Sequence, residues 1–447
     1  MKIQEMSARL DGLVVFRGIL RDPVVERLRT LLHAVVSGGE MVPAAAEFEA
    51  ALFEYGTNWT AYLRKVVLED ANVCVRRLAA GGTDPVLEAC LDGELAFLST
   101  LGTLTLEKVR RAASGEPGEF LPAWETDTLD MAADYRERMR QIGRTGYGIF
   151  AKYHVFTVVN GALSPVKYPD DQTLEELPGY EREREKVIAN TRALLEGKPA
   201  NNVLLYGDAG TGKSSTVKAI ANAFAGDGLR LIEVKKNQLY EIPDLMDSLA
   251  QNPLKFILFI DDLSFTANDD NFAALKAILE GSVCGRAKNI AVYATSNRRH
   301  LIKETLMDRS GDDIHEADTR QELMSLSARF GLTVTFQRPD KARYEAILLE
   351  LAKQYGITIG YHNHTVEFYV DEGKYLMDWV IENTDPETVA FEIDCGWASA
   401  AGIDPVEYIQ KHAGRIAAIH IKENGGIIGA DKPESRHAPA EHPKFEL

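Results

Sequence analysis

The chain has 447 residues, which is enough for about three domains of ordinary size. Its 45% of apolar and 26% of charged residues are typical of a globular protein, and no stretch reaches the roughly 18 uninterrupted apolar residues of a membrane-spanning helix. A net charge of −17 argues against broad attraction to nucleic acid. The cysteines are widely spaced and form no C-x-x-C pair, which argues against a disulfide framework or zinc knuckle and predicts a cytoplasmic protein.

Residues 1–168 predict a mostly helical N-terminal domain without a catalytic motif. Apolar residues recur at helical spacing behind Asp22, a typical N-cap residue, and again in residues 86–101 and 128–142. The aromatic-rich stretch 146–158 has the composition of a core-filling segment rather than of a platform on which bases stack. We therefore expect a helical adaptor in front of the next domain.

Residues 169–345 predict a nucleotide-binding domain of the α/β class. A proline-rich linker at residues 165–178 precedes it. Short apolar runs then alternate with helical patterns, which indicates a parallel sheet covered by helices on both faces. The predicted strands are Val203–Tyr206, Leu229–Val234, Phe256–Asp261, Ile290–Ser296 and Leu332–Phe336.

The loop after the first of these strands fits the phosphate-binding pattern G-x-x-x-x-G-K-[ST] at every fixed position. Its glycines allow successive backbone N–H groups to surround an anion. Lys213 supplies a positive charge for the outer phosphates, and Ser214 supplies a hydroxyl ligand for Mg²⁺. The sequence therefore predicts a site for ATP and Mg²⁺. The residues expected to hold the nucleotide are Gly207, Asp208, Ala209, Gly210, Thr211, Gly212, Lys213, Ser214 and Ser215.

Two carboxylates end the third predicted strand. We expect Asp261 to hold Mg²⁺ opposite Ser214, and Asp262 to orient or deprotonate the attacking water. An acidic strand end without a catalytic role is the alternative. If the assignment holds, Ser214 and Asp261 must lie close enough to share one cation.

Two further residues are candidates for catalysis. Asn297 follows the fourth strand and can reach the γ-phosphate or its water, with Thr295 as the alternative. Arg329 is a candidate for a finger that stabilises charge on the phosphoryl group, and a surface arginine in a salt bridge is the other interpretation. The basic stretch 298–300 is either a local contact for nucleic acid or a solvated loop.

These motifs, in this order, resemble the AAA+ P-loop ATPases, and most closely an uncharacterised bacterial family related to the DnaA- and IstB-type helicase loaders. The resemblance covers about residues 1–344. It implies a five-stranded sheet, Mg²⁺-dependent ATP hydrolysis, assembly into a homo-oligomer in which Arg329 reaches a neighbour's nucleotide, and an unknown protein or nucleic-acid partner. Most of the superfamily has glutamate where this chain has Asp262, and the shorter side chain implies slow hydrolysis. The stretches that carry the resemblance are Gly179–Arg182, Pro199–Gly207, Phe259–Phe265, Tyr293–Leu301 and Arg329–Leu332.

The pattern changes in residues 346–447. Three predicted strands at residues 358–364, 389–394 and 415–422 carry His362 and His364, Asp394, and His420 at or near their ends. Side chains from the carboxyl ends of neighbouring parallel strands can converge on one divalent ion. The sequence therefore predicts a second metal site, weak and suited to Zn²⁺ or Mn²⁺, with simple burial of the histidines as the alternative.

This segment resembles the sugar phosphate isomerase/epimerase family of TIM barrels, which is related to xylose isomerase. The resemblance implies that Asp394 and His420 are metal ligands, with His362 or His364 near the first ligand position. A closed barrel needs eight strands, so we expect an incomplete barrel-like fragment without isomerase activity. The change of pattern within residues 348–357 indicates a chimera of an ATPase that lacks its lid and part of an isomerase.

Three functions therefore compete. The first is an ATPase that remodels or loads a partner, and the second is a metal-dependent sugar phosphate isomerase. The third is a nucleotide-gated scaffold that binds ATP without hydrolysing it.

Overall fold

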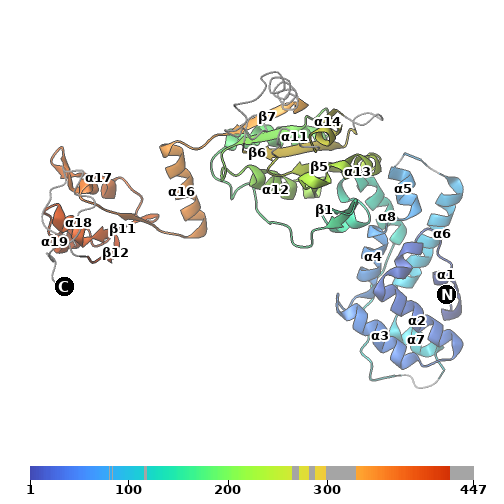
Figure 1. The fold of residues 1–447 in the computed structure, drawn as a ribbon. Helices are drawn as coiled ribbons and strands as arrows, with labels where there is room; N and C mark the ends of the chain where they lie inside the picture. The colour runs from blue at the N-terminus through green and yellow to red at the C-terminus, as the bar shows by residue number, and fades with distance from the viewer. Residues whose placement is uncertain are drawn as a thin grey trace. The chain divides into compact units, whose positions relative to one another are not determined.

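A computed structural model of the chain describes residues 1–79, 81–82, 84–114, 118–263, 271–280, 287–297 and 329–422. These residues belong to two compact units, Met1–Arg338 and Pro339–Leu447. The first unit contains a helical part and a large sheet, and the second contains a small parallel sheet (Figure 1). None of the helices in these ranges combines the length and the apolar character that a membrane crossing needs.

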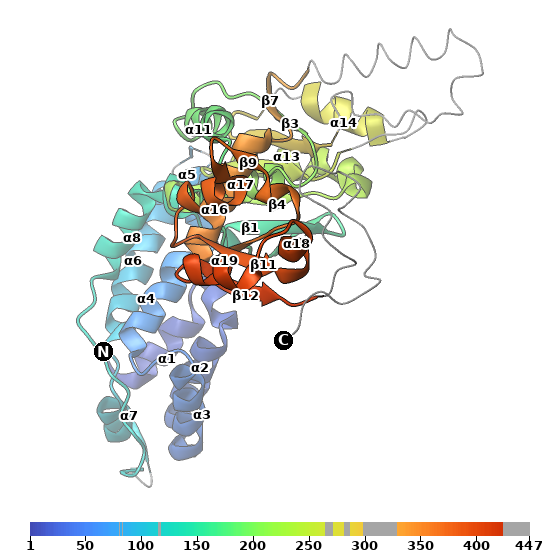
Figure 2. The same ribbon diagram turned by 90° about the vertical axis from the view of Figure 1, so that its left-hand side faces the viewer.

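The helices of residues 3–140 pack around one apolar core, and Figure 2 shows them as a bundle in blue and cyan. Phe48 and Trp59 are fully buried there, and their rings meet edge to face at 5.4 Å. As predicted, Asp22 caps a helix, because its carboxylate accepts hydrogen bonds from the next free backbone N–H groups. The elements are α1 (Ile3–Asp11), η1 (Arg17–Arg21), α2 (Pro23–Ser37), α3 (Met41–Phe53), α4 (Trp59–Glu69), α5 (Val73–Ala79), α6 (Pro85–Gly102), α7 (Leu106–Ala112), α8 (Met131–Arg140), α9 (Ile142–Thr145) and α10 (Ile149–Lys152).

A seven-stranded sheet follows, with the strand order β2-β1-β4-β5-β6-β3-β7. All neighbours are parallel except the β1–β2 hairpin. The five predicted strands are confirmed, and they form the contiguous block β4-β5-β6-β3-β7. The strands are β1 (Val155–Val159), β2 (Ala162–Pro165), β3 (Val203–Gly207), β4 (Leu229–Glu233), β5 (Lys255–Ile260), β6 (Ile290–Ser296) and β7 (Leu332–Phe336).

The sheet has two strands more than the resemblance implies. Residues 155–165, which the sequence analysis assigns to the helical N-terminal domain, form β1 and β2 at the β4 edge. The aromatic-rich stretch 146–158, which continues into β1, fills the core as predicted, since Phe156 is fully buried and the ring centre of Phe150 lies 5.1 Å from that of Phe156. The alternating pattern of β1 is short and lies behind helical sequence, so periodicity alone does not assign it to the sheet. The predicted division into three domains stays a prediction.

Helices cover both faces of the sheet. One face packs against η3 (Lys236–Glu241), α13 (Ile242–Leu249) and α14 (Asn271–Glu280) through an apolar core. On the other face, the buried hydroxyl of Tyr293 on β6 is hydrogen-bonded to Asn190 and Thr191 of α11 (Glu181–Leu195). Helix α12 (Lys213–Ala223) and η2 (Ala225–Asp227) connect β3 to β4. This layered arrangement is the α/β architecture that the sequence predicts.

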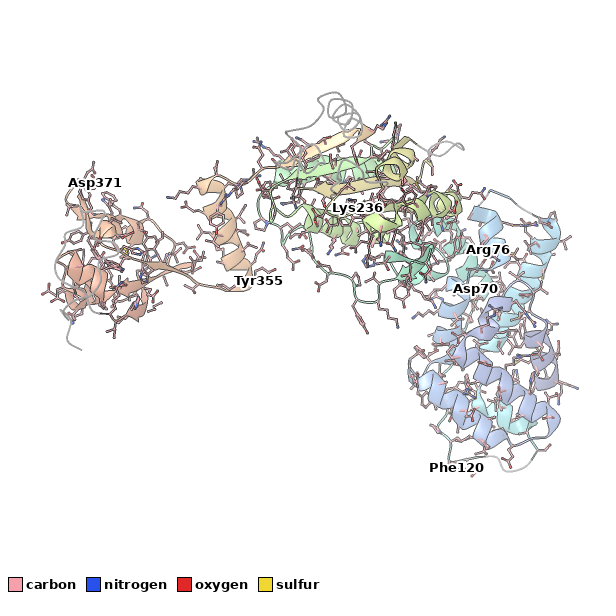
Figure 3. All side chains as sticks on the ribbon, viewed as in Figure 1. Asp70, Arg76, Phe120, Lys236, Tyr355 and Asp371 are labelled. Carbon is pink, nitrogen blue, oxygen red and sulfur yellow. The ribbon has the colours of Figure 1, made fainter. Side chains whose placement is uncertain are left out.

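The helical part and the sheet are joined by specific contacts. The backbone N–H of Gly148 donates to the carbonyl of Glu69 at 2.7 Å. Beside it, burial raises the pKa of Asp70, a side chain labelled in Figure 3, to about 6. On β4, the buried guanidinium of Arg230 donates to the carbonyl of Phe150 at 2.9 Å. These bonds tie the end of the helical part to the β4 side of the sheet.

The second unit contains a three-stranded parallel sheet of order β12-β11-β8, in which consecutive strands are neighbours. The predicted strands are confirmed, and helices connect them as in a (β/α) barrel fragment. Phe391 and Met377 are fully buried in the core of the unit. Its elements are α16 (Lys341–Tyr355), β8 (Ile359–His362), η5 (Val366–Phe368), β9 (Val370–Asp371), β10 (Lys374–Tyr375), α17 (Leu376–Glu382), β11 (Val389–Asp394), α18 (Cys395–Ala400), α19 (Pro405–Lys411) and β12 (Ile416–His420).

Candidate functional site

The glycine-rich loop joins the carboxyl end of β3 to the N-terminus of α12. Gly207, Gly210 and Gly212 all have positive φ angles, of 145°, 76° and 80°. At Gly207 the reason is also steric, because a Cβ atom there would lie 1.9 Å from the carbonyl oxygen of Phe336 on β7. The loop therefore needs glycine both to turn and to lie against the neighbouring strand.

Lys213 is the first residue of α12 and its side chain folds back over the loop. Its ammonium group donates to the carbonyls of Gly207 and Asp208 at 2.9 and 2.6 Å, and to Oδ1 of Asn297 at 3.1 Å. The residue is only 6% exposed. Burial lowers the pKa of Lys213, and nearby carboxylates, first that of Asp208, oppose the shift. The lysine charge is thus held beside the loop at the N-terminus of α12, the end of a helix that favours anions.

Ser214 and Asp261 lie close together, as the sequence analysis requires. The Ser214 hydroxyl donates to Oδ1 of Asp261 at 2.6 Å. Octahedral Mg²⁺, with ligands at about 2.1 Å, places neighbouring ligand oxygens about 3 Å apart. The two side chains can therefore share one such ion, directly or through a water molecule. They meet because β5 and β3 both pair with β6, which aligns the carboxyl ends of the three strands.

Asp262 and Asn297 complete this cluster. Asp262 lies directly beyond β5 with a φ angle of 51°, and its Oδ1 accepts a hydrogen bond from Nδ2 of Asn297 at 3.2 Å. Asn297 therefore connects Lys213 to Asp262. Thr295, which the sequence offers only as an alternative to Asn297, is buried and donates to Oδ1 of Asp261 at 2.5 Å.

One contact in the loop has no signal in the local sequence. The carboxylate of Asp208 accepts a hydrogen bond from the backbone N–H of Arg338 at 2.9 Å, so residues just beyond β7 hold the loop from outside. Thr211 stabilises the loop from within, since its hydroxyl donates to the carbonyl of Asp208.

The remaining candidates of this site are placed less fully. Arg329 is partly buried and precedes Phe330, whose side chain packs into the apolar core that the sheet shares with α13 and α14. Its expected role toward a second copy of the chain stays a prediction. The basic stretch 298–300 lies outside the described residues.

A second cluster forms at the carboxyl ends of the strands in the second unit. His362, Asp394 and His420 offer ligand atoms that all lie within 4.8 Å of one another. Nε2 of His362 and Nδ1 of His420 are each 3.2 Å from Oδ2 of Asp394. Ligands about 2.1 Å from a tetrahedral zinc ion lie about 3.4 Å apart, and the two distances from the histidine nitrogens to Oδ2 are close to this value.

The charged groups of this cluster have opposite effects on metal binding. Oδ2 of Asp394 is fully buried and accepts no hydrogen bond of normal geometry from the described residues, although two histidines and Lys422 lie within 3.2 Å of it. Lys422 is one of them, with its ammonium 3.0 Å from Oδ2 and 3.9 Å from the ring centre of Trp397. The converging histidine nitrogens and the buried carboxylate oxygen favour a metal, whereas the ammonium paired with that oxygen opposes one.

The histidines of this cluster do not have equal roles. Nδ1 of His362 lies 3.0 Å from Oε2 of Glu392, and its other ring nitrogen, Nε2, lies near Asp394. The spacing of ligand residues in the sequence does not indicate this contact with Glu392. His364 does not belong to the group of converging ligands. Its ring centre lies 5.5 Å from that of His362 and 5.8 Å from that of Trp397.

Comparison with known proteins gives one family match. The family described as "Protein of unknown function (DUF815)" matches residues 151–375, half of the chain. These residues include the whole sheet and the glycine-rich loop.

One curated protein and several solved structures are also similar. An inosose dehydratase of Geobacillus kaustophilus is 31% identical over 95 residues, which are 20% of this chain and 30% of that protein. The chain thus spans less than a third of that relative. The RuvB Holliday junction branch migration motor of Thermotoga maritima is 18% identical, over 42% of this chain and 55% of that one, with a TM-score of 0.29. A point variant of the same motor gives 19% identity over the same shares, with a TM-score of 0.29.

Proposed function

The chain belongs to the family described as a protein of unknown function, DUF815, and we propose that the segment shared with this family is a magnesium-dependent ATPase of the AAA+ type. The support comes from the glycine-rich loop, the lysine and the carboxylates assembled at the carboxyl end of one parallel sheet. That edge is where α/β folds bind their ligands.

The observation that carries the proposal is the 2.6 Å contact between Ser214 and Asp261. These residues are 47 positions apart in the chain, and the pattern of the loop does not involve Asp261. Their meeting gives a bound Mg²⁺ one hydroxyl and one carboxylate ligand next to Lys213. A metal held by these two side chains would supply positive charge to neutralise the phosphates.

In this proposal, Asp262 orients or deprotonates the attacking water and Asn297 keeps its carboxylate in place. The 3.2 Å bond between them supports these roles. Asp262 is shorter than glutamate by one methylene group, so we expect slow turnover. A homo-oligomer in which Arg329 acts on a neighbour's nucleotide, and coupling of hydrolysis to loading or remodelling of a protein or nucleic-acid partner, are further parts of the proposal.

Calorimetric titration with ATP and Mg²⁺ tests the binding step. The wild-type chain is compared with Lys213→Ala and with Lys218→Ala, which removes a half-exposed lysine of the same helix that pairs with Asp170. We expect Lys213→Ala to lose at least tenfold in affinity and Lys218→Ala to bind like the wild type. Equal affinity in the wild type and Lys213→Ala refutes the proposal. Phosphate release then separates an ATPase from a scaffold that only binds ATP.

A second candidate function is metal binding by the second unit. The converging side chains of His362, Asp394 and His420 favour it, together with the full burial of the Asp394 carboxylate. The sequence resemblance to sugar phosphate isomerases and the likeness to an inosose dehydratase point to related chemistry. Three strands do not close a barrel, so we propose Zn²⁺ or Mn²⁺ binding without isomerase activity. Metal analysis of the purified chain and of Asp394→Asn tests this, and absence of metal from both, after incubation with either ion, refutes it.

A further inference from the structure

We propose that Thr295 is a positioning residue, which sets the orientation of Asp261 and Asp262 without touching the nucleotide. The inference rests on the proposed ATPase function and assigns a determinant of its metal dependence.

The first observation concerns the Thr295 hydroxyl. It donates its hydrogen to Oδ1 of Asp261 at 2.5 Å and accepts the backbone N–H of Asp262 at 2.9 Å. Donor and acceptor are both used, so the side chain has one favourable orientation. The residue is 2% exposed, and bulk water therefore cannot take the place of the hydroxyl.

The second observation concerns the backbone on either side of Asp262. The backbone N–H of Asp262 donates to the hydroxyl of Thr295, and the N–H of the next residue, Leu263, donates to the carbonyl of Thr295 at 2.7 Å. Asp262 lies between these bonds with a φ angle of 51°, a left-handed conformation that few residues other than glycine adopt. One residue of β6 therefore holds the turn that directs the Asp262 side chain.

The third observation is the register of the sheet. Ile260 pairs with Ala294, and the parallel strands β5 and β6 therefore place Thr295 beside Asp261. Both strands are buried, so this alignment is rigid. The sheet therefore sets where the backbone of Asp261 and Asp262 lies, and the hydroxyl of Thr295 sets how their side chains are oriented.

Loss of the hydroxyl affects the metal more than the nucleotide. Without it, Oδ1 of Asp261 loses one of its three donors, and the N–H of Asp262 keeps only its 3.1 Å bond to that same oxygen. Both changes loosen the carboxylates that face Mg²⁺. The glycine-rich loop and Lys213 keep their own hydrogen bonds, which do not involve Thr295.

The experiment compares Thr295→Val, which has nearly the same shape without a hydroxyl, with Thr295→Ser, which retains it. ATP binding is measured by calorimetry with Mg²⁺ and with a chelator in its place, and phosphate release is measured against Mg²⁺ concentration. We expect Thr295→Val to need about tenfold to a hundredfold more Mg²⁺, as the loss of a hydrogen bond to a charged group implies, with unchanged metal-free ATP affinity. Thr295→Ser should restore the wild-type Mg²⁺ dependence.

Two outcomes overturn the inference. One is an unchanged Mg²⁺ dependence in Thr295→Val, and the other is an equal loss in Thr295→Val and Thr295→Ser. If the valine variant does not fold, Thr295→Ala gives the same comparison. If the proposed ATPase function itself is wrong, the wild type and Lys213→Ala bind ATP equally. The two failures are therefore measured on different variants and can be told apart.

Discussion

Replacement of Gly207 by alanine is expected to weaken the sheet at the point where it carries the glycine-rich loop. The added Cβ atom would lie 1.9 Å from the carbonyl oxygen and 2.5 Å from the carbonyl carbon of Phe336. Both are backbone atoms, so no side chain can move aside, and β3 and β7 must separate. Overlap in a packed interior costs about 1–3 kcal/mol. The φ angle of 145°, rare for residues other than glycine, adds about 1–3 kcal/mol.

Gly210→Ala is the matched control. It lies in the same loop with a φ angle of 76°, and a Cβ atom there would meet nothing within 4 Å. Only the left-handed conformation counts against it, at about 1–2 kcal/mol. The two variants should therefore differ by about 1–4 kcal/mol in the free energy of opening β3 and β7, which is about fivefold to several hundredfold in the opening equilibrium.

Hydrogen exchange measured by mass spectrometry is the suitable assay, because tryptophan fluorescence does not report on the sheet. The four tryptophans are Trp59, Trp124, Trp379 and Trp397, and all lie outside its strands. Peptides that cover β3 and β7 should lose protection in Gly207→Ala, while peptides from α2 should exchange as in the wild type. Equal protection of β3 and β7 in the two alanine variants would refute the reasoning.

Three further predictions concern separate parts of the chain. Burial raises the pKa of Glu49 to about 7, so its contribution to stability is complete below its ordinary pKa of 4.5 and is lost as the pH rises through 7. Urea unfolding followed by tryptophan fluorescence should show less destabilisation between pH 5 and pH 8 in Glu49→Gln than in the wild type, and equal pH dependence contradicts this. Asp262→Asn should retain ATP affinity and lose at least tenfold in phosphate release, whereas unchanged turnover would remove Asp262 from the reaction. Lys422→Met removes the ammonium 3.0 Å from Asp394 and should strengthen Zn²⁺ binding about tenfold or more by calorimetry. Weaker binding in this variant would show that Lys422 supports the metal site.

Much of the candidate site could be read from local sequence. The spacing of the glycines and Lys213 identifies the loop, because its backbone geometry depends on residues that are adjacent in the sequence. The apolar runs identify the strands of the sheet that carries it. The pairing of Ser214 with Asp261 was also predictable, because parallel strands place their carboxyl ends at one edge of the sheet. These inferences depend on short-range backbone geometry and on strand direction, and both leave a pattern in the sequence.

Other features have no such pattern. His364 shares a short motif with His362, yet only His362 converges with Asp394, because the side chains of a strand and of the loop after it point in different directions. Lys422 and Glu392 enter the same cluster through the pairing of β11 with β12 and β8, which spacing along the chain does not reveal.

The amino-acid sequence by itself determined the class of fold, the five central strands and the residues of the glycine-rich loop. Only the tertiary structure decided that β1 and β2 extend the sheet, that a carbonyl of β7 lies against Gly207, and that Thr295 holds the carboxylate of Asp261 and the backbone of Asp262. The physical reason is the range of the interactions. Turns and helix caps depend on residues a few positions apart, whereas strand order and register bring together atoms from distant segments, and the geometry of a site depends on both.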